Sequence, residues 1–232
     1  LPTQTLLVHA EQGLGDTLQF LRYIDLLASR CLRVLLLIQE SLTSLPVLPA
    51  HVELVHEGAP TPHFDVVCPL LSLPHLLGPQ LPGTDALNIP QTIPYLALDH
   101  VRSAGWESHF AHSGLRVGLV WAGNPSHKND ANRSVDFAAL APLWSLEGVH
   151  FYSFQVGARS ADLDSLTPEQ RAKVTDMSPL LQNFGDTAAA LVHVDLLVCV
   201  DTSICHVAGA LGIPVWLLIP WMPDWRWLLH RE

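Results

Sequence analysis

The stretch Asp195–Pro214, Asp-Leu-Leu-Val-Cys-Val-Asp-Thr-Ser-Ile-Cys-His-Val-Ala-Gly-Ala-Leu-Gly-Ile-Pro, decides the fold class of this chain. Its apolar run Leu196–Val200 is short and rich in valine, which is typical of a strand buried on both faces. Asp201-Thr202-Ser203 then offers three good N-cap residues, and apolar residues recur at helical spacing up to Gly212-Ile213-Pro214, which ends the helix. A second apolar run follows at Val215–Ile219. The order of strand, polar turn, helix and strand predicts one unit of a parallel α/β sheet.

The turn after Leu196–Val200 is the first candidate site. Ligands of parallel sheets bind at the carboxyl ends of strands, beside helix N-termini, which is where the chain places Asp201, Thr202, Ser203 and His206. The hydroxyl groups and free backbone N–H groups suit an anion, and the helix dipole adds about 0.3–1 kcal/mol when exposed. The carboxylate suits a ribose or sugar hydroxyl, whereas packing or capping is the alternative role for the histidine. The spacing favours neither a Ser-His-Asp triad nor a metal centre, so we expect no metal and no cofactor.

Composition excludes several classes of function. The 232 residues suffice for one large or two small domains, and 49% of them are apolar, whereas only 15% are charged. The net charge of −10 argues against binding along a nucleic-acid backbone, which needs a basic face. No apolar run approaches the ~20 residues of a membrane span, and no signal segment is visible. The four cysteines form no Cys-x-x-Cys pair, so we expect buried reduced thiols in a cytoplasmic protein.

Each half of the chain begins with a strand, a glycine-containing turn and a helix. In the first half, the strand Thr5–His9 and a helix opened by Thr17 precede a strand at Arg33–Ile38. In the second half, the strand Leu115–Trp121 precedes a helix at Phe137–Leu146. The pattern predicts two α/β domains with parallel sheets, at residues 1–98 and 114–232, with a linker at 99–113. We also expect strands at Val52–Val55, Phe64–Val67 and Val149–Gln155, a helix at Asp186–His193 capped by Asp186 or Thr187, and an aromatic segment at Trp221–Leu229 that is open between helix and loop.

The turn Gly13-Leu14-Gly15-Asp16 is the second candidate site. Its two glycines allow the backbone to approach a ligand, and the helix start at Thr17 favours a negative group. The third glycine of the dinucleotide fingerprint is missing, because Leu18 stands in its place. Asp16 is either the N-cap of the following helix or a carboxylate at a cleft rim, where it could take a proton from an incoming hydroxyl.

The polar loop at 121–134 follows a buried strand, a position at which loops commonly bind ligands. Asn124, Lys128 and Arg133 can donate hydrogen bonds to phosphate oxygens. The alternative is a solvated loop with a surface ion pair between Asp130 and Arg133. The segment Trp221–Trp227 contains three tryptophans, which either stack on a base or sugar or pack the two domains together.

Four groups of residues together resemble a known family: Glu11–Thr17, Trp121–Pro125, Asn132–Ser134 and Asp201–Pro214. In combination they are similar to the glycosyltransferase-like domain that follows tetratricopeptide repeats in many bacterial proteins. That domain resembles the ADP-heptose:lipopolysaccharide heptosyltransferases and, more distantly, O-linked N-acetylglucosamine transferases. The resemblance runs over nearly the whole chain, and no single motif carries it. It implies a GT-B-like fold, in which two Rossmann-like domains with parallel sheets face each other across a cleft.

The resemblance also implies roles for individual residues. The amino-terminal domain would present the acceptor, and the carboxyl-terminal domain would hold a nucleotide-sugar. Asp16 matches the position of the family's candidate catalytic base. Arg133, or alternatively Lys128, matches the basic residue that contacts the donor phosphate. Ser203 stands where the family usually has glycine. The further expected donor-binding positions are Gly13, Gly15, Gly123, Asn124, Ser134, Gln155, Asp201, Thr202, Ser203 and His206.

Two classes of function are consistent with these observations. The leading one is an inverting, metal-independent glycosyltransferase that moves a sugar from a nucleoside diphosphate to a protein or glycan acceptor. The alternative is a non-catalytic module that binds a nucleotide, a sugar or a protein. A GT-B-like sugar-nucleotide epimerase would need acid and base carboxylates that the sequence does not place. Because the chain begins at Leu1 without a methionine, we expect a piece of a longer protein in which tetratricopeptide repeats precede it.

Overall fold

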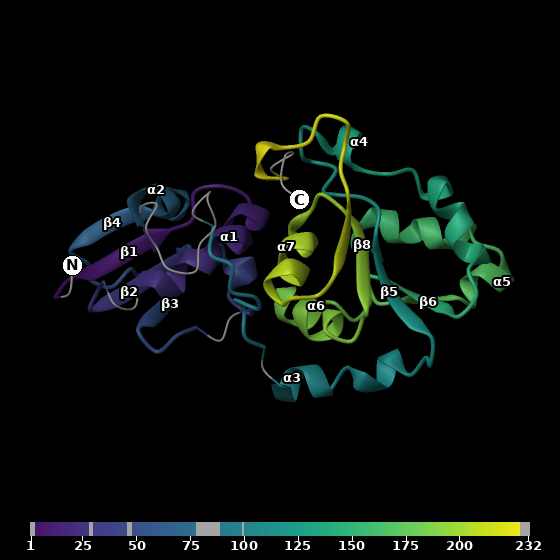
Figure 1. Cartoon of the computed structure of the whole chain (residues 1–232), viewed down its shortest axis with the longest axis horizontal. Helices are drawn as coiled ribbons and strands as arrows, with labels where there is room; N and C mark the ends of the chain where they lie inside the picture. The colour runs from purple at the N-terminus through teal and green to yellow at the C-terminus, as the bar shows by residue number, and fades with distance from the viewer. Residues whose placement is uncertain (1–2, 28–29, 46–47, 78–88, 99, 228–232) are drawn as a thin grey trace.

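The structure, a computed structural model, describes residues 3–27, 30–45, 48–77, 89–98 and 100–227. Two sheets lie side by side along the long axis of the molecule (Figure 1). The first sheet has the strand order β3 (Val52–His56), β2 (Arg33–Ile38), β1 (Thr5–His9) and β4 (Val66–Pro69). The second has the order β7 (Val174–Asp176), β6 (Val149–Ser153), β5 (Leu115–Val120), β8 (Leu196–Val200) and β9 (Val215–Leu218). Neighbouring strands in both sheets are parallel, which confirms the predicted α/β fold class.

Short helices connect the strands. The α-helices are α1 (Leu14–Phe20), α2 (Leu73–Leu77), α3 (His100–Ala104), α4 (Asp130–Arg133), α5 (Pro168–Arg171), α6 (Phe184–Leu191) and α7 (Ser203–Ala210). Turns of 3-10 helix occupy Leu21–Leu27, Glu40–Leu42, Leu70–Ser72, Glu107–Phe110, Phe137–Ser145, Ala158–Ser165 and Trp225–Trp227. Within the described ranges, no helix combines the length and the apolar character that crossing a membrane requires.

The stretch from β8 to β9 forms the predicted strand, helix and strand. β8 lies between β5 and β9, and its Leu197 and Cys199 are fully buried, which explains its continuous apolar sequence. α7 ends in a Schellman motif, in which the N–H of Ile213 donates to the carbonyl of Ala208 over 2.9 Å. Gly212 adopts the positive φ of 78° that this motif requires.

The strand order places the candidate turns at two switch points. The order reverses between β1 and β4 in the first sheet and between β5 and β8 in the second. Ligands of doubly wound sheets bind in the crevice at such points. Gly13–Asp16 follow β1 at the start of α1, whereas most of the other candidate residues follow β5 or β8 and Gln155 follows β6.

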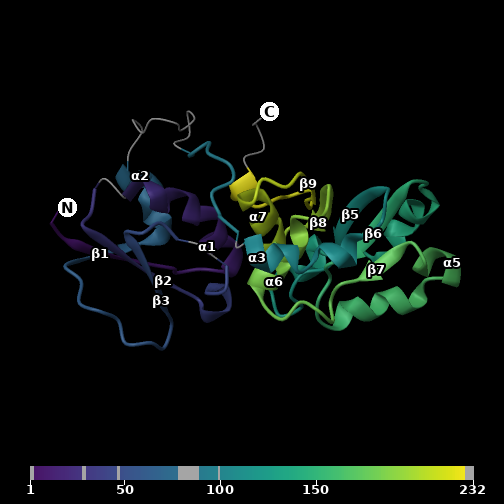
Figure 2. The same cartoon turned by 90° about the horizontal axis from the view of Figure 1, so that it is seen from below.

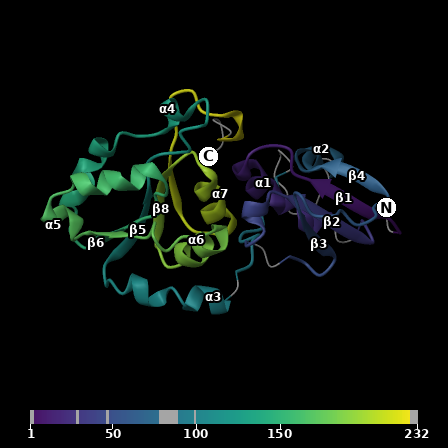
Figure 3. The same cartoon turned by 180° about the vertical axis from the view of Figure 1, so that it is seen from behind.

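The two halves of the chain contact each other through α1 and α7 (Figures 1 and 3). A Cβ atom at Gly15 would lie 2.8 Å from Cδ2 of His206, so a larger residue there would require the histidine ring to move. Tyr95 joins the halves as well, because its N–H donates to Ala210 over 3.0 Å and its hydroxyl donates to Leu18 over 3.2 Å. One hydrophobic core therefore runs from the first sheet to α7.

The region predicted as a linker, residues 99–113, contains α3. In the view of Figure 2, α3 lies between the two halves, and Arg102 on it donates to Asp186 of α6 over 2.7 Å. The N–H of Gly185 donates to Oγ of Ser44 over 3.0 Å, which adds a further contact between the halves. The division at residues 98 and 114 stays a prediction, and residues 1–2, 78–88, 99 and 228–232 of it lie outside the described residues.

Two predicted helix starts are wrong because other residues cap these helices. The first helix begins at Leu14 rather than Thr17, with Gly13 as its N-cap. Asp16 is thus not an N-cap. The helix expected at Asp186–His193 begins at Phe184, because Oδ1 of Asn183 accepts from the N–H of Asp186 over 3.0 Å.

Other differences arise where the sequence pattern is short or interrupted. The helix expected at Phe137–Leu146 is a 3-10 helix, and Pro142 lies inside it. The three-residue strand β7 was not predicted. Within the aromatic segment at 221–229, Trp225–Trp227 forms one 3-10 turn, and residues 228–229 lie outside the described residues.

Replacing Leu197 with alanine tests the core at β8. Leu197 is 0% exposed, and Leu197→Ala is expected to lower the free energy of unfolding by about 2–5 kcal/mol, because it removes buried methyl groups and leaves a cavity. Leu115→Ala, at a position 47% exposed on the neighbouring strand β5, is the matched control and should change it by only about 0.5 kcal/mol. Urea denaturation measures both. Equal losses would contradict the burial of Leu197.

Candidate functional site

The turn after β1 places Asp16 at the boundary between the two halves. The N–H of Gly13, the N-cap of α1, donates to Oδ2 of Asp16 over 3.0 Å. The carboxylate therefore folds back over the helix start. The Asp16 side chain is 16% exposed and lines a cleft together with residues of the second half. From this position a carboxylate can reach a molecule bound between the halves.

Arg226 binds Asp16 across this boundary. Nε of Arg226 lies 2.5 Å from Oδ1 of Asp16. Its Nη2 donates to Gln12 over 2.7 Å and its Nη1 to Asp224 over 2.8 Å, while the guanidinium stacks over the Trp225 ring at 4.7 Å. Burial alone would lower the pKa of Arg226, but the carboxylates of Asp224 and Asp16 raise it above its usual range. Each oxygen of the Asp16 carboxylate thus has a partner.

The start of α7 faces α1 from the second half. Thr202 is the N-cap, yet among the described residues no side chain caps the helix start. The Oγ1 atom of Thr202 is buried and, in the same part of the chain, has no hydrogen-bond partner. The first N–H groups of α7 are therefore available to an anion. The Cα atom of Ser203 lies 3.8 Å from the position of a Cβ at Gly15, so these groups lie close to α1.

Trp227 connects two predicted site residues. Its indole Nε1 donates to Oδ2 of Asp201 over 3.1 Å, and its ring stacks on His206 with 5.2 Å between the centroids and 11° between the planes. Burial alone would lower the pKa of His206, but Cys205, Asp201 and Asp16 raise it above its usual range.

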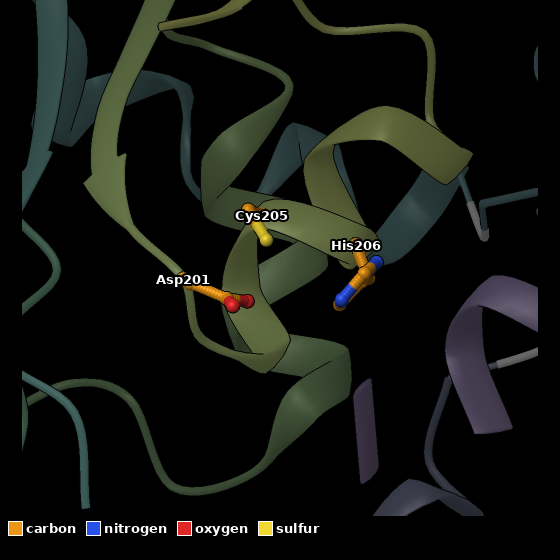
Figure 4. A group of neighbouring side chains, drawn as sticks. All are labelled: Asp201, Cys205 and His206. Carbon is orange, nitrogen blue, oxygen red and sulfur yellow. The ribbon is translucent and has the colours of Figure 1, made fainter. Parts of the chain in front are cut away.

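Cys205 lies between Asp201 and His206 at the start of α7, as Figure 4 shows. A hydrogen bond with Cys199 is the largest of the effects that lower the pKa of the Cys205 thiol, and His206 adds to it against the effect of burial. The pKa of Cys199 is raised, first by its hydrogen bond with Cys205 and then by burial. All four cysteines are free thiols and buried, in line with the buried thiols expected from their spacing.

Arg133, at the end of α4, also lines the cleft. Its Nε donates to Asp130 over 3.1 Å, and its Nη1 donates to the backbone carbonyl of Asp201 over 3.2 Å. The ion pair with Asp130 is present, as the alternative of a solvated loop predicted. The pair is not a surface pair, however, because its two side chains are only 15% and 17% exposed. A Cβ atom at Gly123 would overlap both charged groups, so this glycine leaves room for the pair. The N–H of Gly123 also donates to Oγ of Ser134 over 3.0 Å.

Gln155 joins the ends of two strands. It is 3% exposed, and its Oε1 accepts from the N–H groups of Trp121 and Ala122 over 3.1 and 2.8 Å. Its Nε2 donates to the carbonyl of Val156 over 3.1 Å. The side-chain amide thus fixes the loop after β5 on the end of β6.

Two adjoining cavities contain most of the predicted residues. The cleft between the halves has a volume of about 720 Å³ and is lined by Gly13, Gly15, Asp16, Asn124, Arg133, Asp201, Thr202, Ser203, His206 and Arg226, among others. A second cavity of about 580 Å³, reached from the same helix start, includes Gly123, Gln155 and Thr187 in its lining. Asn124, Thr202 and Ser203 line both, so the cavities meet at the start of α7. Lys128 is exposed and lines neither, and Ser134 also lies outside both linings.

The sequence reasoning missed Arg226, Trp227 and Cys205 as site residues. Arg226 and Trp227 belong to the aromatic segment, for which stacking on a ligand or packing of the two domains was expected. A charged residue between two tryptophans was the available signal for a contact with an acidic group. Helical spacing alone predicts that Cys205 lies near Asp201. This spacing is not among the histidine pairs and Cys-x-x-Cys motifs that indicate a metal site.

Comparison with known proteins relates this site to sugar-transferring enzymes. Residues 132–218 match the family model described as Glycosyltransferase family 9 (heptosyltransferase). This segment includes Arg133 and the whole stretch from β8 to β9, but not Asp16. A curated relative, Protein FlbA of Caulobacter vibrioides, is 23% identical over 160 residues, which are 62% of this chain and 27% of that protein. The chain therefore spans about a quarter of the length of this relative.

Solved structures resemble the chain over almost its entire length. Heptosyltransferase II of E. coli has a TM-score of 0.57 and 15% identity, over 92% of this chain and 84% of that one. A family 9 glycosyl transferase from Veillonella parvula has a TM-score of 0.61 and 16% identity, over 93% and 80%. The E. coli heptosyltransferase WaaC with ADP has a TM-score of 0.58 and 14% identity, over 95% and 88%. At these identities the likeness establishes the fold, that of the GT-B-like family 9 glycosyltransferases.

Removing the charge of Arg226 tests its contact with Asp16. Arg226→Gln keeps a long polar side chain but leaves a carboxylate of 16% exposure without its cation. We expect the free energy of unfolding to fall by about 1–3 kcal/mol, the cost of leaving a partly buried acceptor without its partner. Arg33→Gln is the control, because the Arg33–Glu53 pair is 42% and 46% exposed and should contribute less than about 1 kcal/mol. A thermal or urea transition of Arg226→Gln that matches the control would contradict the contact.

Proposed function

We propose that this chain is a glycosyltransferase that moves a sugar from a nucleoside-diphosphate donor to a hydroxyl group of an acceptor. One observation carries the proposal: Asp16 from the first half lines the same cleft as Arg133 and His206 from the second. Glycosyl transfer needs a base for the acceptor and positive charge for the leaving group, and these residues supply both. The match of residues 132–218 to the family 9 model supports the same reaction class.

The two cavities suggest how the donor is held. The nucleoside would occupy the cavity beside Gln155, and the diphosphate would lie at the start of α7, where the cavities meet. There the free N–H groups of the helix and the Arg133 guanidinium face the phosphate oxygens. The sugar would then extend into the cleft toward Asp16.

The transfer step follows from this placement. Asp16 takes the proton of the acceptor hydroxyl while the acceptor oxygen bonds to the anomeric carbon, and the bond from that carbon to the diphosphate oxygen breaks. Attack from the face opposite the diphosphate inverts the configuration. Arg133 and the N–H groups of α7 take up the charge of the leaving nucleoside diphosphate, so the step itself requires no metal ion. A positioned base contributes about 10²- to 10⁴-fold to such a rate.

Arg226 has to leave Asp16 before this carboxylate can accept a proton. The ion pair, 2.5 Å long, therefore belongs to a resting arrangement of the cleft. The same pair favours a second candidate function, a nucleotide- or sugar-binding module in which Asp16 only holds the halves together. A panel of nucleotide-sugars and acceptors discriminates the two: binding with hydrolysis or transfer supports the enzyme, and binding without turnover supports the module.

The setting of the reaction is part of the same proposal. The acceptor is a protein or a glycan, and the reaction takes place in the cytoplasm. The chain spans only 27% of the length of the curated relative Protein FlbA. We therefore infer that it belongs to a longer protein with further domains. We place tetratricopeptide repeats among them, where they would recruit the acceptor.

Asp16→Asn tests the base. The rate of sugar transfer is expected to fall by about 10²- to 10⁴-fold, because asparagine cannot accept the proton, while the affinity for nucleoside diphosphate is retained. Asp25→Asn is the control, since Asp25 is an exposed carboxylate on the 3-10 turn after α1 and should leave the rate unchanged. Release of nucleoside diphosphate from the donor measures the rate. Transfer by Asp16→Asn at the wild-type rate would remove Asp16 as the base.

Gly123→Ala tests the role of Arg133 without changing a charge. The added Cβ overlaps the Arg133 guanidinium and the Asp130 carboxylate, so the pair has to move. We expect the affinity for nucleoside diphosphate to fall about 10- to 100-fold, which corresponds to the loss of one charge-assisted hydrogen bond. Gly209→Ala on α7 is the control, because its Cβ would meet no atom within 4 Å. Equal affinities of the two variants in calorimetry would exclude a contact between Arg133 and the donor.

A further inference from the structure

Asp201, Cys205 and His206 form a group of metal-ligand side chains at the start of α7 (Figure 4). One ligand atom from each residue lies within 4.8 Å of the others. In the part of the chain that the structure describes, this is the one such group of three or more. Asp201 belongs to the turn after β8, and the other two side chains face it from the first turns of the helix.

We propose that these three side chains bind a single transition-metal ion of the zinc class. A thiolate, an imidazole and a carboxylate are the three ligand types that zinc uses in proteins. The cysteine sulfur argues against Mg²⁺ and Ca²⁺, which take oxygen ligands. The spacing differs from the histidine pairs and Cys-x-x-Cys motifs whose absence led us to expect no metal. Here Asp201, after the end of the strand, supplies one ligand. The helix supplies the other two from Cys205 and His206, which are four and five residues later in the chain.

The ligand atoms must approach one another when the ion binds. In a tetrahedral site with bonds of about 2.0–2.3 Å, ligand atoms are roughly 3.5 Å apart, whereas the widest separation here is up to 4.8 Å. Cys205 is 5% exposed and fixed on the helix, but Asp201 and His206 are only half-buried. We expect the bound ion to draw these two side chains toward the Cys205 sulfur. The positive end of the helix dipole opposes a cation, but two anionic ligands outweigh this effect.

The surroundings of the group support a metal site. The indole Nε1 of Trp227 donates to Oδ2 of Asp201 over 3.1 Å, which orients the carboxylate as outer-shell partners of metal ligands do. The hydroxyl of Thr202, the residue after Asp201, is buried and has no hydrogen-bond partner among the described residues. Asp201 and His206 line the cleft of about 720 Å³. Three protein ligands leave the fourth position of a tetrahedral ion open, and here the cleft gives access to it.

Binding of Co²⁺, which substitutes for zinc and absorbs light, tests this proposal on the whole chain after treatment with a chelator. Wild-type protein is expected to bind one equivalent and to show the near-ultraviolet charge-transfer band of a thiolate–cobalt bond. Added Zn²⁺ should abolish this band. Cys205→Ser should lack it, and the control Cys68→Ser should retain it, because Cys68 is an equally buried thiol on β4 of the other sheet.

Two further variants keep the test decisive if Cys205→Ser does not fold. Asp201→Asn and His206→Gln are each expected to weaken the affinity for Co²⁺ by about 10-fold or more, with the charge-transfer band restored at higher cobalt concentration. Circular dichroism identifies the folded variants. The proposal is overturned if wild-type protein shows no charge-transfer band, or if folded Cys205→Ser or both other variants bind Co²⁺ as the wild type does. None of these readouts depends on sugar transfer.

Discussion

The close approach of α1 and α7 at Gly15 is the contact on which the candidate site depends. A Cβ there would lie 2.8 Å from Cδ2 of His206, so any larger residue would displace the histidine ring from the cleft wall. Each helix follows a strand at the switch point of its own sheet. Because the helices meet by their first turns, Asp16 and Ser203 line one cleft instead of two separate crevices. The absence of one side chain thus converts two ligand-binding positions into a two-sided site.

The segment after β9 contacts both sides of this site. Arg226 pairs with Asp16 of the first half, and Trp227, the next residue, stacks on His206 and donates to Asp201 of the second. The two contacts are adjacent in the chain, so movement of this segment would release the carboxylate and uncover the histidine together. One short piece of chain thus contacts both sides of the cleft.

Much of the fold could be predicted from continuous apolar runs. The bounds of β1, β2 and β8 agree with the sequence pattern, because these strands lie inside their sheets and every residue favours burial. Helix starts were less predictable, because several neighbouring residues can cap and only the folded turn selects one. Asn183 rather than Asp186 caps α6 in this way. Pro142 lies within the apolar run that forms a 3-10 helix, where it removes one backbone hydrogen-bond donor.

The candidate site was predictable where a residue follows a strand and unpredictable where its partner is distant. Gly15, in the first turn of α1, and Asp201 both follow the end of a strand, which local sequence identifies. Arg226 lies 214 residues after Gln12, to which it donates, and no local pattern connects them. The net charge of −10 does not describe the cleft, because two arginines lie there among three aspartates. The electrostatics of a site are set by where the fold places a few charges rather than by the sum over the chain.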